Sequence, residues 1–460
     1  MESIAFKCSI YIKLMYILMG LILSCQAEVH YKSPPHGLPS FMAVWNSPTE
    51  LCMDNFQIKV DVSLFHIVGN PVKTSKAQNI TIFYTDRLGY YPSINEVNGT
   101  ISNGGIPQMV DIDLHLKKAK EDILHYIPST KQSGLAVIDW EDWRPTWIRN
   151  WASKVVYRTH SIEFVLQNSL TITKEKAAKI AKDQFESAAQ SFLLRTLRLG
   201  KSLRPNYLWG FYLFPNCYNY HYKSKPMKYT GHCPEIEKLR NDKLAWLWKE
   251  STALYPNIYL ETALKSSDNA AMFSRHRIQE AFRLSSLSKY SLPIYAYIRP
   301  VFTDRAEEFL SEVDLRNTIG ESIALGVDGF VMWGDFNITL SMKACSSLKS
   351  YLANTLNPYV INVTLASKFC SSVLCHNNGL CKRKQWDSNT YLHLNPESVA
   401  IEQKNGNYFV KGYPTSDDLN YFLEYFTCHC YAGRKCHLPY KIHNQRLTVC
   451  MPNSSICIKA

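Results

Sequence analysis

After its first 25 residues, the sequence lacks any hydrophobic run long enough to cross a membrane. A bilayer-spanning helix needs about 20 consecutive apolar residues. The C-terminal stretch VCMPNSSICIKA also lacks the apolar tail that signals attachment of a lipid anchor. We therefore expect neither a transmembrane helix nor a lipid anchor.

Acidic residues are in the minority, with 39 Asp and Glu against 51 Lys and Arg and a net charge of +12. Such a protein attracts polyanions: nucleic acid, anionic lipid or acidic polysaccharide. The sequence has no RNA-binding or zinc-finger motif, so we expect no nucleic-acid partner. Much of the excess positive charge lies around LLRTLRLGKSLRP. The simpler alternative to a polyanion-binding surface is that this stretch is only the solvated face of a helix.

The N-terminus carries the one marked apolar run. Lys7 and Lys13 precede LMYILMGLILSC, and the polar stretch QAEVHY follows it. About a dozen apolar residues fall short of a membrane span, so the pattern predicts a secretory signal peptide over residues 1–27. Cleavage is expected near Ala27, and a membrane anchor is the alternative interpretation.

Cysteines and glycosylation sequons agree with secretion. Removing Cys8 and Cys25 with the signal peptide leaves 14 − 2 = 12 cysteines, an even number. Oxidising compartments favour disulfides. Asn-x-Ser/Thr sequons predict N-glycosylation at Asn79, Asn98, Asn337, Asn362 and Asn453. The sequence thus predicts a secreted, extracellular glycoprotein.

Short apolar or aromatic runs predict buried strands. The seven runs are FMAVWN from Phe41, ITIFYT from Ile80, LAVIDW from Leu135, LWGFYLF from Leu208, NIYLE from Asn257, PIYAYI from Pro293 and GFVMWG from Gly329. Helical patterns separate most of them, notably over residues 113–127 and 173–200. Seven or eight strand–helix units in about 320 residues predict an α/β fold with a closed parallel barrel. Its chemistry would lie at the C-terminal ends of the strands.

Two carboxylates follow one of these runs, in GLAVIDWEDW. Side chains two residues apart on a strand share a face, about 6.6 Å apart, so Asp139 and Glu141 point the same way. Neighbouring carboxylates repel, and burial raises the pKa of a carboxyl. A carboxyl kept protonated can protonate a leaving oxygen. Glu141, further out, is the predicted acid, and Asp139 its hydrogen-bonding neighbour.

Neighbours on one strand cannot flank a glycosidic bond as the carboxylates of ordinary glycosidases do. If the sugar carries a 2-acetamido group, its carbonyl oxygen can attack instead, with Asp139 polarising the acetamide N–H. Trp140, Trp143 and Trp147 nearby suit sugar stacking and core packing equally. A solvated loop is the alternative interpretation of Asp-x-Glu.

The composition changes after about Asn362. Six cysteines fall between residues 370 and 436: Cys370, Cys375, Cys381, Cys428, Cys430 and Cys436. CHNNGLC and CHCYAGRKC are typical of a growth-factor-type disulfide module, which lacks a core of its own. Zinc binding by the Cys-x-Cys pair and nearby histidines is the competing interpretation.

Taken together, GLAVIDWEDWRPTWIRNW, RPNYLWGFYLFPNCYN, ALYPNIYL, SRHRIQEAFR and ALGVDGFVMWG resemble the animal hyaluronidases, especially the sperm-type members. The resemblance implies a distorted, TIM-like seven-stranded barrel over residues 28–361 and an EGF-like disulfide-rich module over residues 362–460. It implies retaining endo-hydrolysis of β-1,4 bonds in hyaluronan, with weaker action on chondroitin. No cofactor or metal is implied. We expect a monomer, secreted or stored in the sperm acrosome.

The resemblance also assigns roles to single residues. It makes Glu141 the proton donor and Asp139 the carboxylate that holds the acetamide. Tyr212 would lie beside the cleaved sugar and Tyr259 on its acetamide side. The implied substrate-binding residues are Arg277, which would meet a glucuronate, Tyr297 and Trp333 in the groove, and Tyr91 at its entrance. The implied disulfides are Cys52–Cys345, Cys217–Cys233, Cys370–Cys381, Cys375–Cys428, Cys430–Cys436 and Cys450–Cys457.

The sequence departs from the family pattern at Asn216, where an aspartate is usual, and we expect only local consequences there. Two other functions stay open. One is a hyaluronidase-like lectin that binds hyaluronan without cutting it, and the other is a chondroitin hydrolase.

Overall fold

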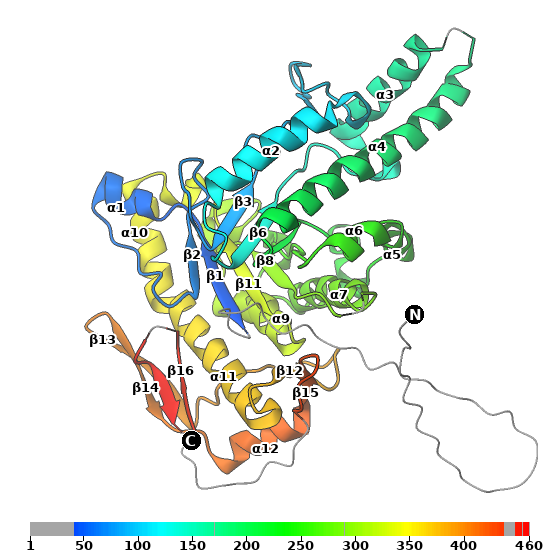
Figure 1. Cartoon of the computed structure of the whole chain (residues 1–460). Coiled ribbons are helices and arrows are strands. Elements are labelled where there is room, and N and C mark those ends of the chain that lie inside the picture. Colours follow the sequence, from blue (N-terminus) through cyan, green and yellow to red (C-terminus); the bar gives the residue numbers. More distant parts are fainter. Residues whose placement is uncertain (1–40, 170, 289, 437–446, 453, 460) are drawn as a thin grey trace, which may run out of the picture.

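The computed structural model describes residues 41–169, 171–288, 290–436, 447–452 and 454–459. Two parallel sheets form most of a barrel (Figure 1). One has the order β2-β1-β11-β8, with strands Ile67–Gly69, Met42–Asn46, Gly329–Trp333 and Tyr295–Ile298. The other has the order β3-β6-β7, with strands Ile80–Phe83, Gly134–Ile138 and Tyr207–Phe211. The predicted signal peptide lies outside the described residues.

The two sheets meet at both edges. Bridges Tyr212↔Tyr255, Leu254↔Ile294 and Asn257↔Tyr297 link β7 to β8. At the other edge β2 passes close to β3, where a Cβ on Gly69 would lie 2.3 Å from Ile80 Cγ2. Only a glycine tolerates that approach, so this residue helps to close the barrel.

Six of the seven predicted runs form strands, and one does not. The NIYLE run makes only isolated bridges, because Pro256 before it has no N–H to donate to a strand ladder. The prediction also missed β2, a strand of three residues. The barrel strands β1, β3, β6 and β7 are buried throughout, as expected for parallel strands covered on both faces.

Helices surround the barrel. The predicted helices correspond to α2 (Ile112–Tyr126) and α4 (Lys174–Leu203), the latter capped by Thr173, whose side chain accepts from the Lys176 amide. With α3 (Val155–Gln167), α4 forms a hairpin that projects from the barrel (Figure 1). The other helices of this part are α1 Glu50–Phe56, α5 Glu235–Asp242, α6 Ala245–Glu250, α7 Asp268–Ser285, α8 Glu312–Leu315, α9 Glu321–Ala324 and α10 Met342–Tyr351. Short strand pairs β4 (Ser93–Ile94) with β5 (Ile101–Ser102) and β9 (Val301–Phe302) with β10 (Arg305–Phe309) lie in the connecting loops.

The C-terminal module begins inside a helix. The predicted boundary at residue 361 falls within α11 (Asn357–Cys375), which continues from the barrel into the disulfide-rich part. Within the described residues, the module's remaining elements are β12 Gly379–Arg383, β13 Val399–Lys404, β14 Asn407–Gly412, α12 Ser416–Tyr425, β15 Phe426–Cys430, β16 Thr448–Cys450 and β17 Cys457–Lys459. Its strands pair as three antiparallel couples: β12 with β15, β13 with β14 and β16 with β17.

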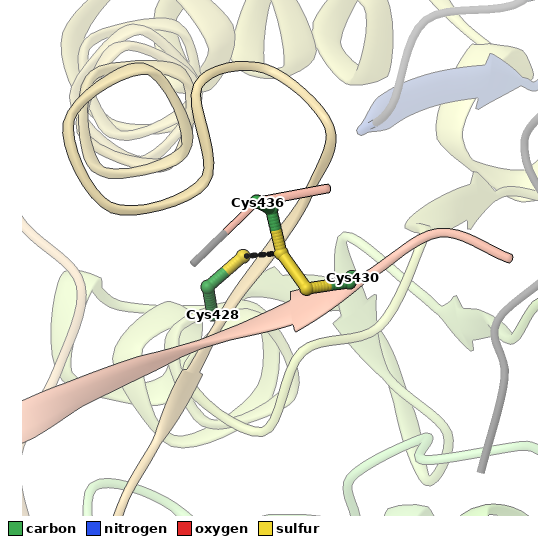
Figure 2. A group of neighbouring side chains, drawn as sticks. All are labelled: Cys428, Cys430 and Cys436. Carbon is green, nitrogen blue, oxygen red and sulfur yellow. Dashed lines mark hydrogen bonds between the residues drawn. A yellow bond between two sulfur atoms is a disulfide. The ribbon is translucent and has the colours of Figure 1, made fainter. Parts of the chain in front are cut away.

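All six disulfides implied by the resemblance are present. Cys52–Cys345 joins α1 to α10 across a separation of 293 residues. Figure 2 shows Cys428 beside the Cys430–Cys436 disulfide, and Cys428 is itself bonded to Cys375. Because these sulfurs are disulfide sulfurs and not thiolates, they are not the ligands that the zinc interpretation requires.

The predicted glycosylation sites differ in their surroundings. Asn79, Asn98 and Asn337 are exposed. Asn362 is half-buried in α11, where its Oδ1 accepts from the Leu394 amide at 3.0 Å. Asn453 lies outside the described residues. Glycosylation of all five stays a prediction.

A buried ion network fixes the module to the barrel. Glu321 of α9 accepts from Arg275 Nε of α7 at 2.7 Å and from Arg383 Nη2 of β12 at 2.5 Å. The Arg275 guanidinium also donates to the carbonyls of Asp387 and Ser388. Glu321 and Arg383 side chains are fully buried. The Glu321 carboxylate therefore serves as the shared counter-ion of two guanidinium groups, where the barrel meets the module.

We expect Glu321→Ala to lower the free energy of unfolding by about 3–5 kcal/mol, because two buried guanidinium groups lose their counter-ion. Urea unfolding measures this. The control is Glu402→Ala, whose carboxylate pairs with Lys411 at 3.7 Å on the surface and should matter by less than about 1 kcal/mol. Equal stability of the two variants would contradict the structural role given to Glu321.

Candidate active site

Polar and aromatic side chains collect at the C-terminal ends of the barrel strands. Inside the barrel, apolar residues such as Val44, Ile82, Val137 and Val331 form a core of their own. Strand alternation directs the residue two positions further along to the same side. The set reached in this way, here called the mouth layer, is Asn46, Tyr84, Asp139, Tyr212, Asn257, Arg299 and Trp333.

The two carboxylates occupy different depths. Asp139 directly follows β6 and is partly buried, with its amide donating to the Phe83 carbonyl at 3.0 Å. Glu141 lies at the rim, and its side chain is 47% exposed. Arg144 Nη2 donates to Glu141 Oε1 at 3.2 Å, and Lys154 Nζ donates to the Glu141 carbonyl at 2.6 Å. Basic side chains therefore hold the Glu141 backbone in place.

Burial raises the pKa of Asp139 to about 8, and the negative charge of Glu141 adds to the effect. From the sequence we expected the outer carboxyl, Glu141, to be the acid. In the structure it is the inner carboxyl, Asp139, whose pKa is raised. Glu141, by contrast, is open to solvent and lies next to the positive charge of Arg144.

Tyr212, Tyr259 and Trp333 form an aromatic wall at the same end of the barrel as these carboxyls. The Tyr259 ring stacks on Trp333 with centroids 6.2 Å apart, and it lies 6.1 Å from the Tyr212 ring. Asn257 Nδ2 donates to the Tyr212 hydroxyl at 2.5 Å. The pKa of Tyr212 is raised by burial and then by the charges of Glu141 and Asp139, so both carboxyls lie close to its phenol.

Tyr84 is hydrogen-bonded to the aromatic wall and lies within the electrostatic influence of Asp139. Its hydroxyl accepts from Trp333 Nε1 at 3.0 Å. Burial raises the pKa of Tyr84 to about 12, with a further contribution from Asp139. The phenol therefore stays neutral at physiological pH and keeps its hydrogen bond to the indole.

Sequence reasoning missed four members of the mouth layer: Asn46, Tyr84, Asn257 and Arg299. Arg299 donates to Asp335 at 2.6 Å, and its guanidinium carbon lies 5.3 Å from the Trp333 ring centroid. Asn46 is 1% exposed, and neither of its amide atoms has a hydrogen-bond partner among the described residues. Following the alternation of β1 to its last residue, and of β3 and β8 just beyond their ends, would have found Asn46, Tyr84 and Arg299. Asn257 lies in the run that forms only isolated bridges, so this rule does not reach it.

Several aromatic residues that the sequence suggested for substrate binding are buried in the core instead. Tyr91 is 2% exposed, stacks on Trp143 and accepts from its amide at 3.3 Å, so the placement at the groove entrance was wrong. Tyr297 is also buried, beneath Tyr212, with ring centroids 5.0 Å apart. It forms the floor of the site. Trp140, Trp143 and Trp147 are all buried, which favours core packing over sugar stacking.

Arg277 was expected to meet a glucuronate, and its surroundings contradict this. The residue is 3% exposed. Its Nε donates to Asn219 Oδ1 and its Nη1 to the Asn257 carbonyl, both at 2.8 Å. The guanidinium also lies 4.2 Å from the Phe273 ring centroid. Arg277 therefore holds Asn257, which in turn donates to Tyr212.

We expect Arg277→Lys to lower the free energy of unfolding by about 2–3 kcal/mol, because a lysine cannot reproduce the forked hydrogen bonds. The substitution should lower kcat more than it raises KM, because Arg277 positions Asn257, and Asn257 in turn positions Tyr212. Thermal unfolding and steady-state kinetics measure both. A raised KM with unchanged kcat and stability would restore the direct substrate role.

Asn216, the departure from the family pattern, has the local role expected. Its Oδ1 accepts from the Tyr218 amide at 3.1 Å, and its carbonyl accepts from Asn241 at 2.8 Å. It precedes the Cys217–Cys233 disulfide. These contacts shape the loop after β7 and include neither Asp139 nor Glu141.

Comparisons with known proteins agree with this geometry. The chain is 50% identical to Hyaluronidase-5 of Mus musculus over 449 residues, covering 96% of this chain and 84% of that protein. It is 48% identical to Hyaluronidase PH-20 of Homo sapiens over 446 residues, covering 96% and 86%. The crystal structure of bee venom hyaluronidase in complex with a hyaluronic acid tetramer matches with a TM-score of 0.61 and 29% identity, over 70% of this chain and 98% of that one.

No helix within the described residues has the length and apolar character needed to cross a bilayer. The family profile described as Hyaluronidase, glycosyl hydrolase 56, matches residues 31–440. With this match and these relatives, the chain belongs to the glycosyl hydrolase 56 family of hyaluronidases.

Proposed function

We propose that this protein hydrolyses the β-1,4 bonds of hyaluronan as an endo-β-N-acetylhexosaminidase with net retention. The observation that carries the proposal is the Asp139–Glu141 pair at the mouth of the barrel, with one carboxyl buried at a raised pKa and one at the rim. The aromatic wall of Tyr212, Tyr259 and Trp333 gives flat faces for a sugar ring.

The pair supplies one acid but no separate nucleophile on the far side of the bond. In the proposed reaction the acetamide oxygen of the substrate attacks the anomeric carbon, and the bond to the leaving oxygen breaks. Glu141 gives that oxygen its proton. The cyclic oxazolinium product is then opened by water, whose proton returns to Glu141.

Asp139 has two tasks in this scheme. Without substrate, the raised pKa of Asp139 keeps a proton on this inner carboxyl. When the acetamide N–H donates to Asp139, the ionised form of that carboxyl is favoured. The proton then belongs on Glu141, where the leaving oxygen needs it.

Positive charge at the rim supports a polyanionic substrate. Arg144 and Lys154 border Glu141, and Arg299 lies beside Trp333. The net charge of +12 acts in the same direction at longer range. The bee venom relative was solved with a hyaluronic acid tetramer. Weaker hydrolysis of chondroitin, which has the same acidic and acetamido groups, is part of the proposal.

Secretion behind the signal peptide of residues 1–27, glycosylation and a monomeric state also remain proposals. They rest on the N-terminal pattern, the sequons and the six disulfides. Storage in the sperm acrosome rests only on the similarity to sperm-type members such as PH-20.

The test is the viscosity of high-molecular-weight hyaluronan after addition of purified protein, measured from about pH 4 to about pH 7.5, a range that includes the pH values at which a general acid can stay protonated. A fall in viscosity supports the hydrolase. Binding without any fall across this range would favour a lectin. Offering chondroitin in parallel and comparing kcat/KM decides between the two polymers, and a higher value for chondroitin would contradict the proposed preference.

A further inference from the structure

A cavity of about 520 Å³ lies between the barrel and the C-terminal module, and none of its lining residues belongs to the mouth layer. It is lined by Arg316 from the π-helical turn Arg316–Gly320, by Phe369 of α11, and by Tyr421 and Phe422 of α12. The segment between β12 and β13 supplies the remaining wall, including Tyr391. Its size is within the range of small-ligand sites, roughly 300–1,000 Å³.

Arg316 is the cationic side chain of a lining that also includes the carboxylates of Asp417 and Asp418, and it is paired with neither of them. No ion pair or hydrogen bond of its guanidinium is recorded among the described residues, and its Nε is buried without a partner. Its guanidinium carbon lies 5.6 Å from the Tyr391 ring centroid. A half-buried guanidinium without a bonded carboxylate can take an anionic ligand, because arginine binds carboxylates through two parallel hydrogen bonds.

The carboxylates around the cavity are engaged elsewhere or exposed. Glu321 is bound by Arg275 and Arg383. Asp418 lines the cavity but accepts from Asn395, Ser398 and Thr415. Asp417 is an exposed residue in the first turn of α12 and forms no ion pair with Arg316.

The rest of the lining suits a sugar ring. Tyr391 and Tyr421 are the half-buried aromatic residues of the lining, and Phe369 and Phe422 are buried behind it. Tyr421 is fixed by donating its hydroxyl proton to the Tyr391 carbonyl at 3.0 Å. Asn389 adds an amide whose Oδ1 is occupied by Arg275. Aromatic faces beside a few polar groups and one cation are a combination that holds carbohydrate rings bearing an acid.

We infer that this cavity is a second saccharide-binding site, which takes a carboxylate-bearing sugar with its ring on the aromatic side chains and its carboxylate on Arg316. The identity of that sugar as the glucuronate of hyaluronan rests on the proposed function. A polymer held at this site stays near the mouth layer between cuts, because the second contact raises its local concentration.

The test measures binding of a hyaluronan tetrasaccharide by calorimetry in a Glu141→Gln background, where the ligand is not cleaved. Two sites per chain are expected. Arg316→Gln should weaken one of them at least tenfold and leave the other unchanged. Arg195→Gln, which removes an equal charge from the surface of α4, is the matched control and should leave both sites intact.

Asn389→Asp is an independent variant in case Arg316→Gln folds poorly. An aspartate can still accept from Arg275, but it places a negative charge beside the cavity and should also weaken that site at least tenfold. A tetramer of N-acetylglucosamine, without carboxylates, should not occupy the cavity. A single site in the Glu141→Gln protein, or two sites unaffected by both variants, would overturn the inference. The viscosity assay reports on the proposed function separately.

Discussion

Glu141→Gln should lower kcat on hyaluronan by about a thousandfold or more, because an amide has no acidic proton for the leaving oxygen, and general acid catalysis contributes roughly 10²–10⁴-fold. Substrate affinity should stay near that of the parent protein. Glutamine keeps an oxygen that can accept from Arg144 at the same position, and the side chain is exposed enough for the change to leave the core intact. Initial rates and equilibrium binding of a tetrasaccharide measure the two effects.

The matched control is Glu163→Gln, the same chemical change on an exposed residue of α3. It should leave both rate and binding unchanged. If Glu141→Gln retains activity within tenfold of the parent protein, Glu141 is not the acid, and the inner carboxyl must be reconsidered for that role.

Asp139→Asn should lower kcat by about 10²–10³-fold and change KM little. The acetamide nitrogen becomes positive only as the oxazolinium forms, so the charge of Asp139 is needed most in the transition state. Asparagine keeps the shape but not the charge. A parallel rise in KM with unchanged kcat would indicate that Asp139 serves binding alone.

The same substitution should change the dependence of stability on pH. The pKa of Asp139 is raised to about 8 in the folded protein, from an unfolded value of 3.8. The folded state therefore holds a proton that the unfolded chain has lost, and stability declines as pH rises from about 4 to about 8. Asparagine does not ionise, so Asp139→Asn should gain thermal stability over the parent protein, increasingly so toward pH 8.

Thermal unfolding at several pH values across that range measures this gain. If the difference in melting temperature between the two proteins does not change with pH, ionisation of Asp139 is not the cause of the pH-dependent loss of stability. Loss of activity together with a gain of stability is the expected mark of a residue that is strained for function.

The aromatic residues show where sequence patterns stop being informative. Trp333 and Tyr259 do line the site, whereas Tyr91 and Trp143 stack on each other in the core. A tyrosine or tryptophan suits either place, because each has a large apolar face and one polar atom. The difference is set by which side of the strand or loop faces the barrel interior, and local sequence gives this only where a strand is already known.

Sequence alone determined the parts that depend on short-range chemistry. The strand runs and the Thr173 cap of α4 follow from backbone geometry over a few residues. The disulfide pairs came from resemblance to a family, since spacing leaves many pairings open.

Tertiary structure decided everything that depends on burial and on distant partners. It buried Arg277 against Asn219 and Asn257, placed the raised pKa on Asp139, and left Arg316 without a counter-ion in a cavity. The cost of a charge depends on how much water and which opposite charges surround it, and those are supplied by segments far away in the chain. Residue order therefore fixed which groups were available, and packing fixed their ionisation and exposure.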